Sequence, residues 1–227
     1  MLKNEPNESH QHQSETAMTN SIMTVEETES TPPTLLIGTN NNSVTDTTLS
    51  TSETTWESFK DKLNAPDIGS KDGAYFIRTE GTIRTDKDTG DTACILILDG
   101  DSSLNSTGET IPGAPHPKRV SAVIRKLGVT HCIYSSYSNG CNKANEDSDC
   151  DPSFHKYRVI IPCHYHREQL DNLLKHIFAE LHKAGVMLVN VKENKSWSQA
   201  WYYPRVPNKN AQEMFNFYSY KGQRLDA

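Results

Sequence analysis

Basic residues are almost absent from the N-terminal quarter of this chain of 227 residues. The first 55 residues contain Lys3 as their only Lys or Arg, against eight Asp and Glu, which gives a net charge of −7 and leaves +1 for residues 56–227. Ser, Thr, Asn and Glu dominate this segment, and its apolar residues follow no sustained period. Such a segment cannot bury enough apolar surface to offset the entropy lost on ordering. We therefore predict a disordered acidic tail over residues 1–54 and one folded domain over residues 55–227.

Targeting and membrane signals are also missing. The N-terminus has neither the basic cluster nor the apolar stretch of a secretory signal peptide. No run of 18 apolar residues marks a membrane span. These absences predict a cytoplasmic protein with no membrane partner.

Cysteine is scarce, and its distribution argues against a disulfide framework. Three of the five cysteines lie in or beside apolar runs, which is typical of small buried side chains in a reducing compartment. Cys141 and Cys150 flank the polar stretch "NKANEDSD", and their spacing matches no C-x₂₋₄-C zinc knuckle. An exposed insertion is the favoured interpretation, and a zinc clip completed by His155 is the alternative. The three cysteines of the apolar runs are Cys94, Cys132 and Cys163.

Hydrophobic periodicity predicts alternating strands and helices after the tail. Trp56, Phe59 and Leu63 recur at i, i+3 and i+7, as on one face of a short helix. The nearly continuous apolar run "ACILILD" is typical of a strand covered on both faces. The order of the central elements, β-α-β-β-α-β, predicts an α+β protein with an RRM-like, split β-α-β core. The predicted strands are 73–81, 93–99, 129–138, 156–163, 186–191 and 198–204, and the predicted helices are 55–64, 116–128 and 167–185.

Two acids one residue apart end the most apolar strand. Alternate residues of a strand face the same side, so Asp99 and Asp101 are expected to point into one site. Two carboxylates that close repel each other unless a cation lies between them, and hard oxygen ligands suit Mg²⁺ or Mn²⁺. Gly100 between them is expected to let a ligand approach the backbone closely. The alternative is a strand that runs into an ordinary polar turn.

Four motifs in order resemble the archaeo-eukaryotic primase superfamily, in the branch found in phage, plasmid and mobile-element replication proteins. In that branch a strand ending in Asp-x-Asp precedes strands of the form "hhYTTxSH" and "rYRvhhP", a long helix, and a closing "SQxxYxPR". This chain has "ILILDGD", "HCIYSSYSN", "KYRVIIP" and "WSQAWYYPR" in the same order. The resemblance covers about residues 55–208. It implies a primase-type core and DNA primase or polymerase activity, a metal-dependent nucleotidyl transfer from nucleoside triphosphates on a single-stranded DNA template.

The resemblance also implies roles for individual residues. Asp99 and Asp101 match the catalytic, metal-binding pair for Mg²⁺ or Mn²⁺. Arg158 matches the basic residue of "rYRv", a candidate triphosphate contact. The other matched positions are Ser136, Ser138 and Lys156 for nucleotide binding, and Ser198, Gln199, Tyr203, Pro204 and Arg205 in the closing motif. From the residues alone, Ser198 and Gln199 could simply begin a strand, Tyr203 could lie in the core, and Arg158 could be a solvated strand residue.

Three positions depart from the pattern of that branch. Ser138-Asn139 stands where a small residue followed by His is usual, and no His occupies the second-motif position that faces the triphosphate. The third motif expects an Asp, where this chain has Asn190 with Glu193 nearby. Asn carries no charge, so a two-metal site would lack one compensating carboxylate. A catalytically inactive, nucleic-acid-binding relative is therefore an alternative.

A rival hypothesis comes from His164-Tyr165-His166. A His-hydrophobic-His triplet is the metal-binding signature of rolling-circle replication nucleases, and on a strand both imidazoles face one side. The triplet follows Pro162 and lies directly before the predicted long helix, and no Tyr nucleophile follows on that helix. Exposed histidines at the start of the helix are the favoured interpretation.

The third hypothesis is a binding module without catalysis. The folded region has no dense stripe of Lys and Arg, which argues against tight duplex binding. Trp197 and residues 201–203 supply aromatic rings that could stack bases, although clustered aromatics on a strand are more often core. No G-x-x-x-x-G-K-[ST] loop is present, so a replicase role would need a separate replicative helicase as partner.

Overall fold

The computed structural model describes residues 34–140 and 151–226. The N-terminal part of the predicted tail, residues 1–33, and the candidate zinc ligands Cys141 and Cys150 lie outside these described residues. The described part is an α+β fold in which most strand pairs are antiparallel. This confirms the α+β part of the predicted fold class.

The largest sheet is built around β9 (Tyr157–His166). Its antiparallel neighbours are β5 (Thr92–Gly100) on one side and β8 (His131–Ser135) on the other. Two further strands complete it: β12 (Phe217–Tyr220) pairs with β8, and β13 (Leu225–Asp226) pairs in parallel with the second half of β9. Strands β5, β8 and β9 confirm the strands predicted in segments 93–99, 129–138 and 156–163.

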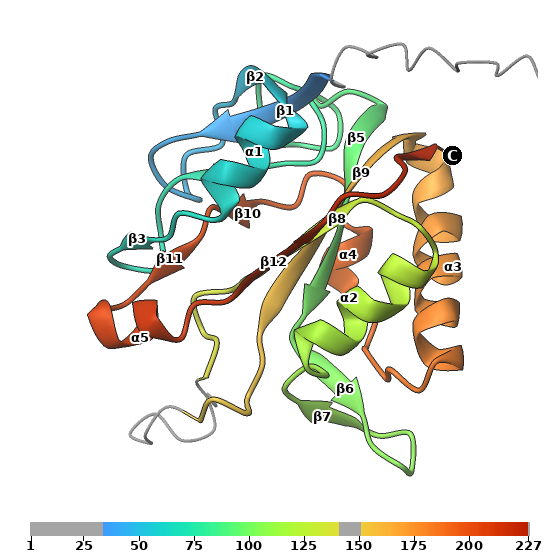
Figure 1. Ribbon diagram of the computed structural model, residues 1–227. Helices are drawn as coiled ribbons and strands as arrows, with labels where there is room; N and C mark the ends of the chain where they lie inside the picture. The colour runs from blue at the N-terminus through green and yellow to red at the C-terminus, as the bar shows by residue number, and fades with distance from the viewer. Residues whose placement is uncertain (1–33, 141–150, 227) are drawn as a thin grey trace, which may run out of the picture. The chain divides into compact units, whose positions relative to one another are not determined.

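Two helices cover one face of this sheet (Figure 1). Helix α2 (Pro117–Lys126) begins where the His116 ring accepts a hydrogen bond from the Lys118 amide, and Gly128, at φ +73°, ends the turn after it. Helix α3 (Leu170–Lys183) follows a short 3-10 turn, η1 (Arg167–Gln169), and buries one apolar stripe against the strands. Their core partners are the residues of β5, β8 and β9 that face the helices, namely Leu96, Leu98, Ile133, Val159 and Ile161.

The opposite face of the sheet carries a second layer. Strands β1 (Thr34–Asn40), β2 (Ser50–Thr55), β4 (Tyr75–Phe76) and β10 (Trp201–Tyr202) form a four-stranded sheet in the order β10-β4-β1-β2. Helix α1 (Trp56–Leu63) packs with it, and Figure 1 shows this layer beside β5. The second hydrophobic cluster lies here, because the alternate β5 residues Ile95 and Ile97 point away from α2 and α3.

The expected tail boundary at residue 54 differs from the structure. Leu35 and Ile37 of β1 are no more than 1% exposed, so residues 34–54 belong to the folded part. The apolar pattern of β1 is too short to predict a strand. It consists of three adjacent apolar residues in a polar stretch, and strand alternation places two of them inward. Leu36 between them points outward and is 43% exposed.

Three predicted strands are shorter than expected or absent. Of segment 73–81 only β4 is a strand, and of segment 198–204 only β10. Segment 186–191 forms no strand and makes one isolated bridge, Ser103 with Leu188. The segment lies beside residues 102–104, since the Leu104 amide donates to the Met187 carbonyl and the Val189 amide donates to the Ser102 carbonyl. Beyond the segment, the Asp99 amide of β5 donates to the Asn194 side chain of helix α4 (Lys192–Lys195).

The remaining elements are short. They are β3 (Asp67–Ile68) paired with β11 (Arg205–Val206), the hairpin β6 (Ser102–Leu104) and β7 (Thr110–Pro112), and helix α5 (Lys209–Glu213). Within the described ranges, none of the helices has the length and apolar character needed to cross a membrane.

The burial of β1 generates a stability prediction. Ile37→Ala removes a fully buried side chain and is expected to lower the free energy of unfolding by about 2–5 kcal/mol in urea titrations. Leu36→Ala, one residue earlier on the exposed side, is the matched control and should change it by no more than about 0.5 kcal/mol. Equal small effects of both changes would mean that β1 does not contribute to the core.

Candidate functional site

A row of three residues crosses the main sheet at one end. Asp99 of β5 lies opposite Arg158 of β9, which lies opposite Tyr134 of β8. Their neighbours in sequence pack toward α2 and α3, so strand alternation turns this row to the other face. The row lies where the second hydrophobic cluster ends, since Tyr134 is its last member on β8. It is therefore polar on one side and supported by core on the other.

The row forms one wall of a pocket with a volume of about 260 Å³. Nine of the residues matched by the sequence motifs line it, although they come from β5, β9, the residues next to these strands, the residues after β8 and the segment after β10. Lys71 and Glu193, which the motifs did not assign, also line it. The nine are Asp99, Asp101, Ser136, Ser138, Lys156, Arg158, Tyr203, Pro204 and Arg205.

Each of the two carboxylates faces a cation, Arg158 of β9 or Lys156 directly before it. Lys156 Nζ lies 2.6 Å from Asp101 Oδ1, and Arg158 Nε lies 3.6 Å from Asp99 Oδ1. The cations are the more buried partners, with 8% and 13% of their side chains exposed, whereas Asp101 is 48% exposed. Protein cations thus offset the repulsion that two neighbouring acids would create.

Arg158 is held in place by more than its ion pair. One of its terminal nitrogens donates to the Tyr202 carbonyl at 3.1 Å, and the same carbonyl accepts from the Tyr134 hydroxyl at 3.0 Å. The guanidinium lies 5.4 Å from the centre of the Trp201 ring. Its Nε makes no hydrogen bond within the described part of the chain. The side chain is anchored at Tyr202, and its Nε–H lies beside Asp99 without a hydrogen bond.

The pKa of Asp99 lies above its ordinary value of 3.8. Burial is the main cause, because it disfavours the charged carboxylate, and the nearby acids Asp101 and Glu193 act in the same direction. Arg158 and Lys156 oppose the shift. The site therefore stores an electrostatic cost that a bound cation would relieve.

Asn194 supports the acidic strand end from behind, and sequence reasoning did not identify it. Its side-chain oxygen accepts from the Asp99 amide at 2.7 Å, and its side-chain nitrogen donates to Asn190 at 3.2 Å. Its own carbonyl accepts from Arg78, a fully buried guanidinium that also donates to Tyr165. No motif marks this chain of contacts, because its members lie far apart in the sequence.

Glycine occupies position 100 for a different reason from the expected one. A side chain there would meet the ring of Tyr157 at 2.4 Å, on the face of the helices rather than in the pocket. The Tyr157 hydroxyl donates to the Pro115 carbonyl at 2.8 Å. Glycine is thus required for packing between β5 and β9, and a close ligand approach to the backbone does not explain it.

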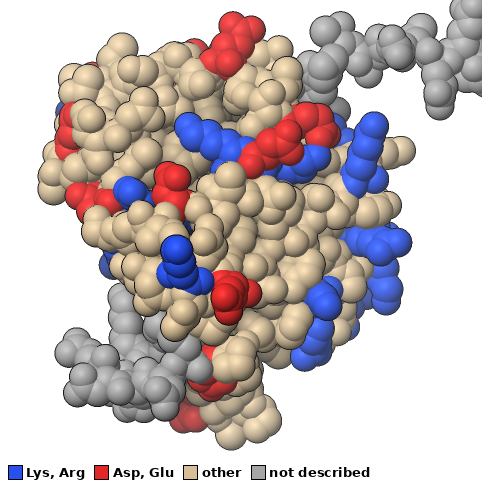
Figure 2. All heavy atoms as spheres, turned by 60° about the vertical axis from the view of Figure 1, so that its left-hand side comes forward, with Lys and Arg blue, Asp and Glu red and all other residues tan. Residues whose placement is uncertain are grey.

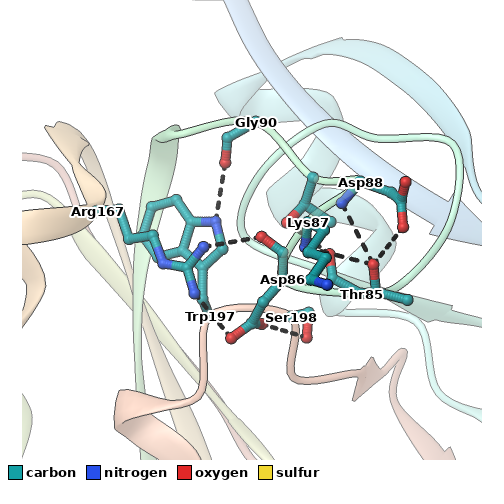
Figure 3. A network of polar contacts seen from close by, with 9 residues as sticks. Thr85, Asp86, Lys87, Asp88, Gly90, Arg167, Trp197 and Ser198 are labelled. Carbon is teal, nitrogen blue, oxygen red and sulfur yellow. Dashed lines mark hydrogen bonds and ion pairs between the residues drawn. The ribbon is translucent and has the colours of Figure 1, made fainter.

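Ser198 and Gln199 do not line the pocket. Ser198 donates to the Asp86 carboxylate, which is also bound by Arg167, while the Trp197 indole donates to the Gly90 carbonyl (Figure 3). The Gln199 side chain donates to the carbonyl of Ala200, the next residue. The network in Figure 3 ties the loop before β5 to η1 and to the segment after α4.

Tyr203 belongs mainly to the core. It is 6% exposed, its ring packs against Phe76 and Phe59, and Lys62 lies over it at 3.7 Å. Burial raises its pKa. Only part of the residue reaches the pocket wall, so the structural alternative for Tyr203 holds alongside the pocket position.

The histidine triplet lies elsewhere. His164 and His166 are exposed at the far end of β9, with ring centres 6.5 Å apart, and Tyr165 between them is buried. Six residues of extended strand, roughly 20 Å, separate His164 from Arg158. Across residues 34–140 and 151–226, no group of three or more His, Cys, Asp or Glu is placed to hold a metal ion.

Comparison with protein-family models, with curated protein sequences and with solved structures gives no match to this chain. The interpretation of the pocket therefore rests on its residues and their geometry.

The raised pKa of Asp99 predicts a pH dependence of stability. The folded state keeps the Asp99 proton to a higher pH than the unfolded state, so this group's contribution to stability falls as the pH rises from 3.8 through the folded-state pKa. Asp99→Asn removes the titration, and the stability of that variant relative to the parent should therefore increase over the same range. Thermal melts across that pH range measure the difference.

Arg158→Gln provides the second arm of this test. It removes the cation that opposes the shift, so the decline in stability should extend to higher pH than in the parent. A constant stability difference between the parent and Asp99→Asn at all pH values would contradict the raised pKa.

Proposed function

We propose that this protein is a primase-polymerase-type enzyme that transfers nucleotides from nucleoside triphosphates onto a strand paired with a single-stranded DNA template. The observation that carries the proposal is one pocket with both signs of charge: Asp99 and Asp101 beside Lys156, Arg158 and Arg205. A triphosphate needs cationic donors for its oxygens, and its divalent cation needs carboxylates. Few other ligands require both within about 260 Å³.

The carboxylates suit Mg²⁺ or Mn²⁺. Mg²⁺ is usually held by one or two carboxylates together with substrate phosphates, not by a complete protein cage. Asp99 and Asp101 provide such a pair, and Glu193 brings a third carboxylate to the same pocket. A divalent cation there would neutralise phosphate charge and activate the attacking hydroxyl. Asn190 bonds to Asn194, so we assign the role of the missing third-motif Asp to Glu193, which lines the pocket and would join Asp99 and Asp101 only when a cation draws the three carboxylates together.

The basic residues of the pocket can pair either with the two acids or with the triphosphate. Without nucleotide, Lys156 and Arg158 face the two acids. When nucleotide binds, these side chains turn their donors toward the triphosphate oxygens, and Arg158 Nε has no hydrogen bond to lose. Arg158 remains anchored to the Tyr202 carbonyl, so it orients the triphosphate from a fixed point. Ser136 and Ser138 add hydroxyl groups at the end of β8.

The order of elements around the pocket also supports the proposal. β5, α2, β8, β9 and α3 follow one another as in the first five elements of a split β-α-β core. We propose that the core is a variant of the RRM-like primase type, in which segment 186–191 and α4 take the place of the last strand. The acids then lie at the end of its first strand, as in the superfamily that the motifs resemble.

The direct test is the double change Asp99→Asn with Asp101→Asn. It should lower Mg²⁺- or Mn²⁺-dependent nucleotide incorporation on a single-stranded template by at least about 100-fold. The fold should be retained, because Asn has the shape of Asp and the Asp99 backbone amide keeps its bond to Asn194, while the loss of the ion pairs to Lys156 and Arg158 lowers stability. Melts with Mn²⁺ and nucleotide should show stabilisation of the parent and none of the double variant.

His164→Ala with His166→Ala is the matched control and should leave incorporation and the ligand-induced stabilisation unchanged. Equal stabilisation of both Asp variant and parent would place the metal elsewhere. A strand-nicking activity of the parent that this control abolishes, without any incorporation, would favour the rolling-circle nuclease hypothesis instead.

Glu193 gives a separate prediction. Glu193→Gln removes the third carboxylate from the pocket and should reduce incorporation by roughly tenfold or more, with the loss partly recovered at higher Mn²⁺ concentration. Lys192→Gln, an exposed neighbour on α4, serves as the control and should retain full activity. Full activity of Glu193→Gln at limiting Mn²⁺ would remove Glu193 from the metal site.

A further inference from the structure

A second hollow lies on the other face of the main sheet, between α2 and β12. This open groove has a volume of about 750 Å³ and is separate from the pocket that contains Asp99. Its walls come from the outward side of α2 and from the strand at the edge of the sheet. Its lining residues are Lys118, Ser121, Ala122, Arg125, Lys126, Phe217, Tyr218, Ser219 and Tyr220.

The groove carries charge of one sign. Lys118, Arg125 and Lys126 line it and are exposed, and none of the described residues that line it is Asp or Glu. The three cations span seven to eight helical positions, which is about 10–12 Å along α2. On the face drawn in Figure 2, basic and acidic side chains are mixed over much of the surface, while basic ones gather along the right-hand edge. A groove lined in this way attracts a polyanion.

Two aromatic rings lie beside these cations. Tyr218 and Tyr220 are two residues apart on β12, so they face the same side with roughly 7 Å between them. Lys118 Nζ lies 5.9 Å from the centre of the Tyr218 ring, and the Arg125 guanidinium lies 5.2 Å from that of Tyr220. Both rings are partly exposed. A cation beside an exposed ring matches a nucleotide, whose phosphate and base need one of each.

We infer that the groove between α2 and β12 binds a single strand of nucleic acid, with Lys118, Arg125 and Lys126 on its phosphates and Tyr218 and Tyr220 stacked on its bases. A single strand is favoured over a duplex, because only unpaired bases offer a free face to the rings. It is favoured over an acidic peptide, because carboxylates would use the cations and leave the paired rings without a role.

The groove lies within reach of the nucleotide pocket. Phe217, at the start of β12, pairs with Tyr134, which pairs with Arg158, which pairs with Asp99. Three strand spacings of about 4.8 Å place the start of the groove roughly 14 Å from the acids. If the proposed transfer reaction holds, the groove would hold the template as it leaves the pocket around the sheet edge. Strand binding itself does not require that reaction.

The experiment measures binding of a fluorescent oligothymidylate to the full chain as a function of NaCl concentration. The triple variant Lys118→Gln, Arg125→Gln, Lys126→Gln should bind more weakly. The slope of log K against log[salt], which is negative, should become less steep by about 2, or about 0.7 for each lost phosphate contact. The double variant Tyr218→Leu, Tyr220→Leu keeps the apolar packing. It should lose on the order of tenfold in affinity with an unchanged slope.

Lys87→Gln, Lys175→Gln and Lys183→Gln form the matched control, with three exposed lysines removed from other surfaces. Its salt slope should stay within about half a unit of that of the parent. Equal slopes for the groove variant and this control would overturn the inference. So would full competition by a polyglutamate peptide together with no effect of the tyrosine changes, which would indicate an acidic peptide ligand.

The outcome separates the two proposals. If Asp99→Asn with Asp101→Asn binds oligothymidylate as the parent does, the groove acts independently of the pocket. If the parent incorporates no nucleotide but the groove variants still lose binding as described, the proposed transfer reaction fails and the groove stands.

Discussion

The antiparallel pairing of β5 with β9 is the interaction on which the rest of the structure depends. Its register sets Asp99 against Arg158 and Gly100 against Tyr157. The same alternation sends Leu96 and Leu98 to the helices and Ile95 and Ile97 to the second layer. A shift by one residue would exchange the two faces, moving the acid into the helix core and the apolar residues into the pocket. Core burial therefore fixes the position of the charged site.

The charge arrangement of the pocket follows from this placement. An acid at the end of a buried strand loses hydration, and its raised pKa reports that cost. Arg158 belongs to β9 and Lys156 directly precedes it, and β9 is already paired with β5, so compensation needs no additional element. Paired charges in a partly buried site are a modest source of stability. In the proposed reaction their value is chemical: the carboxylates of these ion pairs would turn to a divalent cation and the basic side chains to the phosphates of the nucleotide that carries it.

Contacts between distant segments give the site its rigidity. The fully buried Arg78 bonds to the α4 backbone, and the Asn194 side chain of that helix bonds to the Asp99 amide. This arrangement occupies the side of β5 on which a further strand was expected, and it ends the sheet there with an amide contact. The network of Asp86, Arg167 and Ser198 similarly ties the loop before β5 to α3 through η1. Ser198 thus supports the structure, although its motif suggested the site.

The sequence alone determined the α+β class, helices α1, α2 and α3, and the three central strands, because strong hydrophobic periods and stop residues such as Gly128 act locally. It also indicated nine residues that meet in one pocket, since alternation in β5 and β9 places polar strand ends on one side. The tertiary structure decided what no local pattern encodes. β1 is ordered because its two inward residues find a core built by segments far along the chain. Segment 186–191 makes only one isolated bridge, with Ser103, and the Asp99 amide at the edge of β5 donates to the Asn194 side chain of α4. The groove beside α2 exists only because β12, nearly 100 residues later, pairs with β8 and brings its tyrosines to the lysines and arginine of that helix. Periodicity indicates which face of an element is buried, and long-range packing determines which other segments cover that face.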